Sequence, residues 1–184
     1  MKNILRICPP EFSGSLDNSL RKLLQNPDRI LKPHIVVGMT VLDLGCGPGY
    51  FTVNIARILS GTGKVIAADL QDGMLLKVYR KIRKTDLEPV VELHKCQENN
   101  IGITEKVDFI LAFWMVHEVP DHERLLNELK SILKPHGKLY IIEPRLHVTE
   151  IAFKRMLDKC LNAGFQIEAR PKVFFSRTVL LIHK

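Results

Sequence analysis

The chain has 184 residues, with 27 Lys and Arg against 20 Asp and Glu, a formal charge of +7, and 46% hydrophobic residues. This composition is typical of one globular domain with a sizeable core, and it excludes disordered, collagen-like and coiled-coil proteins. No apolar run approaches the roughly 20 residues that span a bilayer, and the N-terminus carries no recognisable signal sequence, so we expect a cytoplasmic protein without a membrane span.

Apolar runs and helical spacing alternate along most of the chain. Leucines repeat on one helical face over residues 13–25, where we expect a helix that packs on the sheet or also covers the active site as a lid. The strands expected after it are at 41–45, 64–70, 89–94, 107–113 and 138–142. The helices expected between and after them are at 50–59, 72–85, 122–133 and 150–162.

Two further extended stretches, 165–169 and 173–182, close the chain. Too few residues separate them for a crossover helix, so they are expected to form an antiparallel hairpin at the end of the sheet. The predicted fold class is α/β, a Rossmann-like seven-stranded and mostly parallel sheet with helices on both faces. We expect a single domain over 1–184, with a helical N-terminal cap at 1–36 and a cofactor-binding core at 37–184.

The cysteines at positions 8, 46, 96 and 160 are scattered, with no C-x-x-C pair and no histidine at metal-ligand spacing. This pattern predicts neither a disulfide framework nor a metal site. Reduced thiols agree with a cytoplasmic location.

A glycine loop follows the first predicted strand, in the segment 41–49 (VLDLGCGPG). Glycines at a strand-to-helix turn let a ligand approach the backbone closely, and the amides of the helix N-terminus face an anionic group. Asp69 ends the second strand, where its carboxylate is placed to accept hydrogen bonds from two ribose hydroxyls. Together the two features predict a nucleoside-binding site.

The spacing of the glycines decides between two kinds of nucleoside ligand. The dinucleotide pattern G-x-G-x-x-G, counted from Gly45, requires glycine at position 50, and Tyr50 stands there. The Asp43 carboxylate would repel a pyrophosphate but could orient a cationic amino group. This loop therefore favours an adenosine that carries an amino acid.

These segments resemble class I S-adenosylmethionine-dependent methyltransferases, close to the small-molecule branch that includes the ubiquinone and menaquinone biosynthesis enzymes. Segment 41–49 resembles the family's motif I, and 67–75 (AADLQDGML) its second segment. Segments 107–113 (VDFILAF) and 133–139 (LKPHGKL) resemble its fourth strand and the entry to its fifth. The resemblance covers roughly residues 35–182, in the family's order.

The resemblance implies S-adenosylmethionine as the cofactor and S-adenosylhomocysteine as its product. Asp43 and the loop glycines would hold the methionine portion, Asp69 the ribose, and Leu70 with Gln97 the adenine. Where the family usually has an Asp that contacts adenine, this chain has Gln97, whose amide oxygen can accept the same hydrogen bond, and Glu98 is a second candidate or a solvated loop acid. The full set of expected cofactor contacts is Asp43, Leu44, Gly45, Cys46, Gly47, Gly49, Tyr50, Phe51, Asp69, Leu70, Met74, Cys96, Gln97, Glu98, Ala112 and Phe113.

Two residues are candidates for catalysis. His117 follows the fourth strand and can accept a proton from an acceptor, although a histidine in this loop can also be a packing or capping residue. Glu143 lies at the carboxyl end of the fifth strand, where open α/β sheets bind ligands, and the alternative is a surface carboxylate paired with Arg145 or Lys138. Methyl transfer needs a base only if the acceptor must lose a proton.

The function predicted from the sequence is methyl transfer from S-adenosylmethionine to a small-molecule acceptor. The signature of many nucleic-acid amino-methyltransferases is absent after the fourth strand, which argues against a nucleic-acid partner. The alternatives are an RNA or protein methyltransferase, which the charge of +7 favours, and a non-catalytic S-adenosylmethionine-binding protein. Neither the acceptor nor the oligomeric state can be read from the chain.

Overall fold

The computed structural model describes residues 24–183 and shows one seven-stranded sheet in the order β3-β2-β1-β4-β5-β7-β6. All neighbouring strands are parallel except at β7, which is antiparallel to both β5 and β6. The strands are β1 (Thr40–Leu44), β2 (Lys64–Asp69), β3 (Val91–Lys95), β4 (Val107–Phe113), β5 (Leu133–Pro144), β6 (Gln166–Ala169) and β7 (Ser176–Ile182). The predicted α/β class and the terminal hairpin are confirmed.

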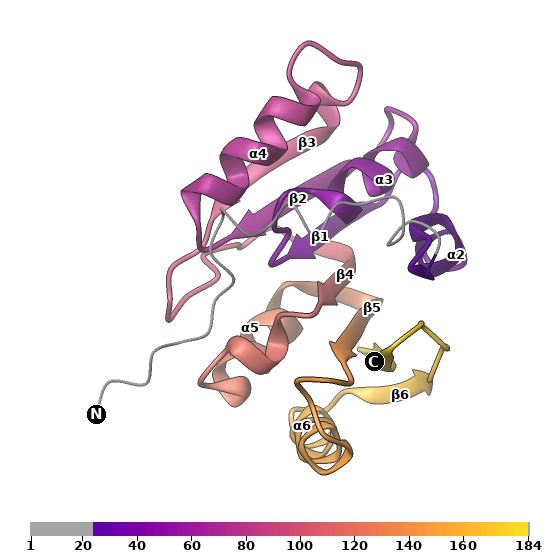
Figure 1. Cartoon of the computed structure of the whole chain (residues 1–184), viewed down its shortest axis with the longest axis vertical. Coiled ribbons are helices and arrows are strands. Elements are labelled where there is room, and N and C mark those ends of the chain that lie inside the picture. Colours follow the sequence, from indigo (N-terminus) through magenta and orange to yellow (C-terminus); the bar gives the residue numbers. More distant parts are fainter. Residues whose placement is uncertain (1–23, 184) are drawn as a thin grey trace.

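Helices cover both faces of this sheet (Figure 1). One face packs against α2 (Pro27–Leu31), α3 (Tyr50–Leu59) and α4 (Asp72–Ile82), and the other against α5 (His122–Ile132) and α6 (Glu150–Asn162). Short 3-10 turns, η2 (Glu88–Val90) and η3 (Val116–Glu118), complete the described elements.

Alternation along the strands explains this two-sided core. In β1, Val41 packs on the α2 and α3 side, while Leu42 and Leu44 pack on the α5 and α6 side. Successive side chains of a strand point to opposite faces, so a strand buried on both faces must be apolar at nearly every position. The runs that identified the strands in the sequence are therefore the direct result of double burial.

The predicted element boundaries differ from the observed ones at a few ends. The helix predicted to reach residue 85 ends at Ile82, and the strand predicted from residue 89 begins at Val91, after the η2 turn. The fifth strand is longer than predicted because it begins at Leu133, whose backbone pairs with Val107 ahead of a register shift. The helix predicted over 150–162 matches α6 at both ends.

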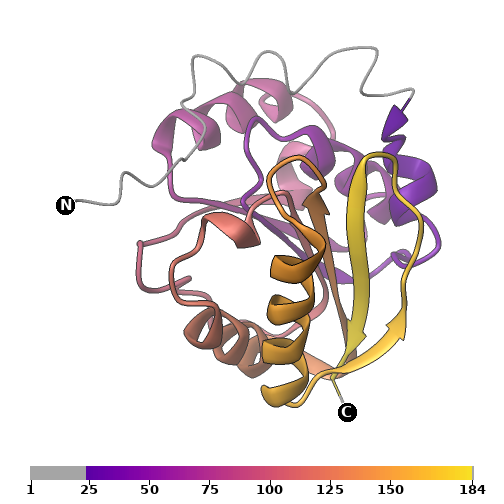
Figure 2. The same ribbon diagram turned by 60° about the horizontal axis from the view of Figure 1, so that its bottom comes forward.

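The hairpin places β7 between β5 and β6, so Ser176 at the start of β7 pairs with Pro144 at the end of β5 (Figure 2). The loop before β7 thereby lies at the carboxyl edge of the parallel strands. That edge also carries the ends of β1, β2 and β4, because these strands are parallel and in neighbouring positions. It is the edge where open α/β sheets bind ligands.

The helix predicted over residues 13–25 lies almost entirely outside the described residues, as does most of the segment expected to form a cap, so both stay predictions. The described chain begins beside the site, where the Tyr50 hydroxyl donates to the carbonyl of Gln25 at 3.0 Å. The Asn26 side chain then caps α2 by accepting from the amides of Asp28 and Arg29. None of the helices within residues 24–183 is long and apolar enough to cross a membrane.

Candidate active site

The glycine loop joins β1 to α3 and is fixed against the neighbouring strand. The amides of Gly45 and Cys46 both donate to the carbonyl of Ala68, at 2.8 and 3.0 Å. Gly45 has a φ of +68°, and a Cβ placed on it would lie 2.8 Å from the Cβ of Met115. Only glycine combines that backbone conformation with so close a neighbour. The loop therefore lies directly against the segment that follows β4.

Asp69 faces this loop from the end of β2. One of its carboxylate oxygens accepts from the amide of Gly47 at 2.9 Å and the other from the amide of Gln71 at 2.8 Å. Burial raises the pKa of Asp69, and the amide hydrogen bonds and Lys95 only partly offset that effect. The two amides hold the carboxylate in one orientation at the cavity wall.

Asp43 is buried at the carboxyl end of β1. The hydroxyl of Thr52, which is buried on the first turns of α3, donates to its carboxylate at 2.6 Å. This bond ties the strand to the helix across the glycine loop. Two carboxylates thus fix the loop, Asp43 by joining its flanks through Thr52 and Asp69 by holding the amide of Gly47 within it.

These groups surround one cavity of about 360 Å³ at the carboxyl edge of the sheet. Its size falls in the range of small-molecule and cofactor sites. Of the residues predicted from the sequence, those that line the cavity are Asp43, Leu44, Gly45, Cys46, Gly47, Tyr50, Phe51, Asp69, Leu70, Met74, Cys96, Gln97, Glu98, Phe113 and His117. Gly49, Ala112 and Glu143 do not line it: Gly49 caps α3, Ala112 is buried in the core and Glu143 lies behind His117.

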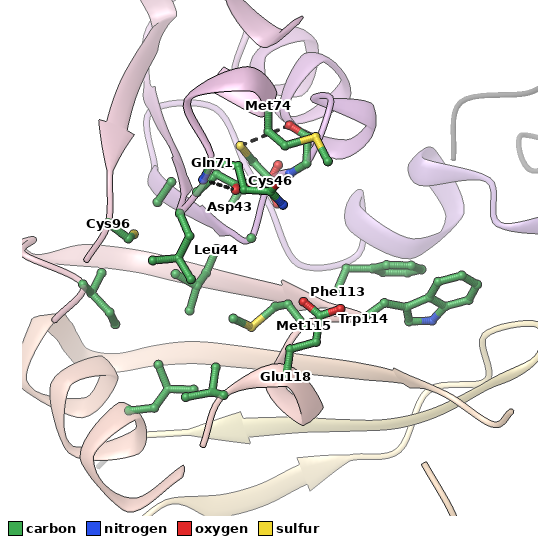
Figure 3. Close-up of a pocket in the computed structure, with 18 of the residues that line it drawn as sticks. Asp43, Leu44, Cys46, Gln71, Met74, Cys96, Phe113, Trp114, Met115 and Glu118 are labelled. Atoms are coloured by element: carbon green, nitrogen blue, oxygen red, sulfur yellow. Dashed lines mark hydrogen bonds between the residues drawn. The ribbon is translucent and has the colours of Figure 1, made fainter. Parts of the chain in front are cut away.

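Aromatic side chains form one wall of the cavity (Figure 3). The ring centroids of Phe51 and Phe113 are 4.4 Å apart, and those of Phe113 and Trp114 are 5.2 Å apart. Trp114 has a φ of +57°, which is unusual for a bulky residue, and its indole donates to the hydroxyl of Ser176 at 3.1 Å. Strain of this kind is concentrated at functional sites.

The two cysteines in the cavity are neutral thiols at physiological pH. Burial raises the pKa of Cys96 to about 11, and burial together with Asp43 and Asp69 raises the pKa of Cys46 well above its ordinary value. A thiol is a weak nucleophile and metal ligand. Within residues 24–183, no three His, Cys, Asp or Glu side chains are grouped so that they could hold a metal ion.

The two candidate catalytic residues lie together. A carboxylate oxygen of Glu143 forms a short hydrogen bond with Nδ1 of His117, and the other oxygen accepts from the amide of Val116 at 2.9 Å. Glu143 is only 1% exposed. The alternative of a surface carboxylate is therefore wrong: Lys138 pairs with Glu168, and the guanidinium of Arg145 donates to the carbonyl of Ser176.

The contact with Glu143 affects both the pKa and the tautomer of His117. Burial is the largest effect and lowers its pKa, but the hydrogen bond and charge of Glu143, with the charge of Glu118, outweigh it, so the pKa is raised. Because Nδ1 is engaged by a carboxylate, a neutral ring carries its lone pair on Nε2. A half-buried histidine oriented in this way at a cavity wall can take a proton from a bound molecule.

Three residues of the cavity with ionisable side chains were not among the predicted site residues: Glu118, Arg124 and His147. Burial raises the pKa of Glu118 to about 7, with further contributions from Glu143 and Asp69. The only signal for Glu118 in the sequence is its position next to His117. Arg124 and His147 come from α5 and the loop after β5, whose approach to the site depends on the packing of the whole domain.

Comparison with known proteins identifies the family. A family described as a methyltransferase domain matches residues 35–172 of this chain. The chain belongs to this methyltransferase family. The match extends from before β1 into the terminal hairpin, so it includes the glycine loop, Asp69 and the His117–Glu143 pair on one domain. The fold and the cavity of this methyltransferase thus belong to the class I S-adenosylmethionine-dependent type that its motifs resemble.

Individual relatives agree with that assignment. An S-adenosylmethionine-dependent methyltransferase from Aquifex aeolicus is 30% identical, with a TM-score of 0.84 over 95% of this chain and 98% of its own. The demethylmenaquinone methyltransferase of Lactobacillus johnsonii is 31% identical over 61% of this chain and 46% of its own length. A ubiquinone/menaquinone biosynthesis C-methyltransferase of an Enterobacter species is 32% identical over 58% of this chain and 43% of its own length. This chain matches under half the length of these two curated relatives.

Proposed function

We propose that this protein transfers a methyl group from S-adenosylmethionine to a small aromatic acceptor, with His117 as the base. The observation that carries the proposal is that one cavity joins a glycine loop and the fixed carboxylate of Asp69 to a histidine–carboxylate pair. The first two features suit a nucleoside that carries an amino acid, and the third suits an acceptor that must lose a proton.

The residues of the cavity fit the cofactor. The backbone of Gly47 has a φ of +52° and open space on its Cβ side, so a ligand can approach the loop there. Asp69 would accept from the ribose hydroxyls, and Leu70 with Gln97 would contact the adenine. The buried Asp43 would orient the methionine portion through the loop. When bound, S-adenosylmethionine supplies an electrophilic methyl group on a positively charged sulfur.

The reaction needs little from the protein beyond placement and one proton transfer. Nε2 of His117 takes a proton from the acceptor, and Glu143 stabilises the imidazolium that results. With S-adenosylmethionine bound, the acceptor's electron pair would form the new bond to the methyl carbon, and the sulfur would keep the electron pair of the carbon–sulfur bond that breaks, which leaves a neutral thioether. The products are a methylated acceptor, S-adenosylhomocysteine and a proton that His117 returns to solvent.

The aromatic wall favours an aromatic acceptor. Phe51, Phe113 and Trp114 line the cavity as a run of mutually tilted rings, and a flat ring packs well against such a wall. Two relatives carry names that refer to quinone precursors and to methylation at carbon. A phenolic or quinol ring is the class that agrees with both, because loss of its hydroxyl proton to His117 makes a ring carbon nucleophilic.

The first test is isothermal titration of the wild type with S-adenosylmethionine, S-adenosylhomocysteine and NAD. We expect micromolar binding of the first two and none of NAD. The second test incubates the protein with S-adenosylmethionine carrying a labelled methyl group and a panel of naphthoquinols, phenols, an RNA and a peptide mixture. Label in a quinol or phenol supports the proposal, label in RNA or peptide overturns the acceptor class, and cofactor binding without transfer to any of them overturns the catalytic role.

A further inference from the structure

Glu118 differs from the buried carboxylates around the cavity, Asp43, Asp69 and Glu143. Asp43 accepts from a threonine hydroxyl, Asp69 from two backbone amides, and Glu143 from a backbone amide while it also bonds His117. Within the described residues, the half-buried carboxylate of Glu118 has no hydrogen-bond or ion-pair partner, although it lines the cavity. A desolvated carboxylate near other negative charges is costly to ionise unless a cation faces it.

The position of Glu118 indicates where that cation would lie. The η3 turn carries Glu118 next to His117, and Met115, three residues earlier, packs against Gly45 of the cofactor loop. The Glu118 side chain extends beside Met115 toward Phe113 (Figure 3). It therefore lies at the junction between the loop that holds the cofactor and the base that activates the acceptor. In-line transfer requires the methyl-bearing sulfur to lie at this junction.

We propose that Glu118 is the residue that distinguishes the charged cofactor from its neutral product, by facing the sulfonium across the cavity. The inference rests on the proposed function. The two ligands share their adenosine, ammonium and carboxylate groups, and they differ only in the methyl group and the positive charge at sulfur. An unpaired carboxylate attracts the sulfonium and has no charge to attract in the thioether. Methyl transfer then abolishes the attraction, and the product leaves.

Several charged or titratable groups from the neighbouring elements lie around the same cavity as Glu118. Asp69 from β2 and Glu143 from β5 are negative, and Asp43 from β1 lines the same cavity. His117 on its own turn, Arg124 from α5 and His147 from the loop after β5 supply positive or titratable groups. Arg124 is directed elsewhere, to the carboxylate of Glu128 at 2.7 Å. The carboxyls raise the affinity of Glu118 for a proton, and a bound sulfonium would lower it.

The decisive experiment measures the dissociation constants of both ligands by titration at pH 8. The quantity to compare is the dissociation constant of S-adenosylhomocysteine divided by that of S-adenosylmethionine. In Glu118→Gln we expect this ratio to fall about tenfold, mostly by weaker cofactor binding. Glu118→Asp should restore part of it. Glu123→Gln is the matched control, because Glu123 is on exposed α5 surface and is paired only loosely with Lys159. An unchanged ratio, or equal weakening of both ligands, overturns the inference.

Proton linkage gives an independent readout. Calorimetric titration at pH 6.5 in buffers of different ionisation enthalpy measures the protons released on binding. The wild type should release more protons with S-adenosylmethionine than with S-adenosylhomocysteine. In Glu118→Gln the two ligands should release the same number. His117→Gln should keep the difference, which separates Glu118 from its titratable neighbour. Equal proton release with both ligands in the wild type overturns the inference. If neither ligand binds the wild type, the proposed function itself fails, so the two failures are distinguishable.

Discussion

Glu143 bonds the imidazole of His117 although 26 residues separate them in the chain. Glu143 is near the end of β5, while His117 belongs to the turn after β4, and the same carboxylate also accepts from the amide of Val116. One buried side chain thus fixes both the backbone and the ring of the turn beside the cavity. The relationship joins two separate sequence candidates into one unit, in which Glu143 orients the ring that we propose as the base.

Replacement of His117 by Gln should lower kcat by about a hundredfold to ten-thousandfold, the usual contribution of a general base. The dissociation constant of S-adenosylmethionine should change little, because the residues expected to hold its adenosine and amino-acid portions lie on other elements. Single-turnover rates with a labelled methyl group and titration of the same sample check both parts. A full rate in this variant would show that the acceptor needs no base.

Replacement of Glu143 by Gln should shift the pH dependence of the reaction. The hydrogen bond and charge of Glu143 raise the pKa of His117 against the effect of burial, so their loss lowers that pKa. Because the base must be neutral, the acidic limb of kcat should move to lower pH in Glu143→Gln. A pH–rate profile measures the limb in both proteins. A limb that stays in place while the rate falls would mean that Glu143 acts only by orienting the ring.

Removal of the Asp69 carboxylate should weaken cofactor and product equally. In Asp69→Ala we expect about tenfold to a hundredfold weaker binding of both ligands, since the ribose loses charge-assisted hydrogen bonds. Asp72→Ala is the control, because that aspartate is exposed and is paired with Lys95 at the surface. Titration with each ligand provides the comparison. Unequal losses, or an equal effect in the control, would place the ribose elsewhere.

A methyl group added at Gly45 should disturb both the fold and the site. Gly45→Ala combines a strained φ with a contact to Met115, whereas Gly61→Ala has a similar φ of +79° and open space. We expect a loss of about 1–3 kcal/mol in the free energy of unfolding for Gly61→Ala from backbone strain alone, and a larger loss for Gly45→Ala. Denaturant unfolding measures both. Equal losses of unfolding free energy in the two variants would mean that the Met115 side chain moves away from the added methyl group at no energetic cost.

Glu118 should make the ligand-free protein less stable as the pH rises. Its folded pKa of about 7 lies above its ordinary value of 4.5, so the folded state binds more protons between these values and stability falls across that interval. Glu118→Gln should therefore match the wild type near pH 4 and exceed it at pH 8. Unfolding free energies of the two proteins across this range give the difference directly. A constant difference would show that Glu118 is an ordinary solvated acid.

The sequence by itself determined the fold and most of the residues that line the glycine-loop side of the cavity. Double burial makes the parallel strands continuous apolar runs, and the turn after β1 needs glycine, so both leave local patterns in the chain. For this reason the sequence predicted the alternation of strands and helices, the terminal hairpin, the glycine loop and Asp69. The ends of most elements were misplaced by a few residues, for example where the η2 turn precedes β3 and where β7 begins at Ser176.

Only the tertiary structure decided how the remaining polar residues act. Glu143 is buried against His117 because parallel β4 and β5 bring their carboxyl ends together, a contact that no local pattern encodes. Among residues 24–183 the Glu118 carboxylate has no hydrogen-bond or ion-pair partner, because the turn after β4 packs over Gly45 and places this carboxylate at the cavity. Hydrogen bonding and desolvation depend on neighbours distant in sequence. The chemistry of both carboxylates therefore follows from the packing of the domain.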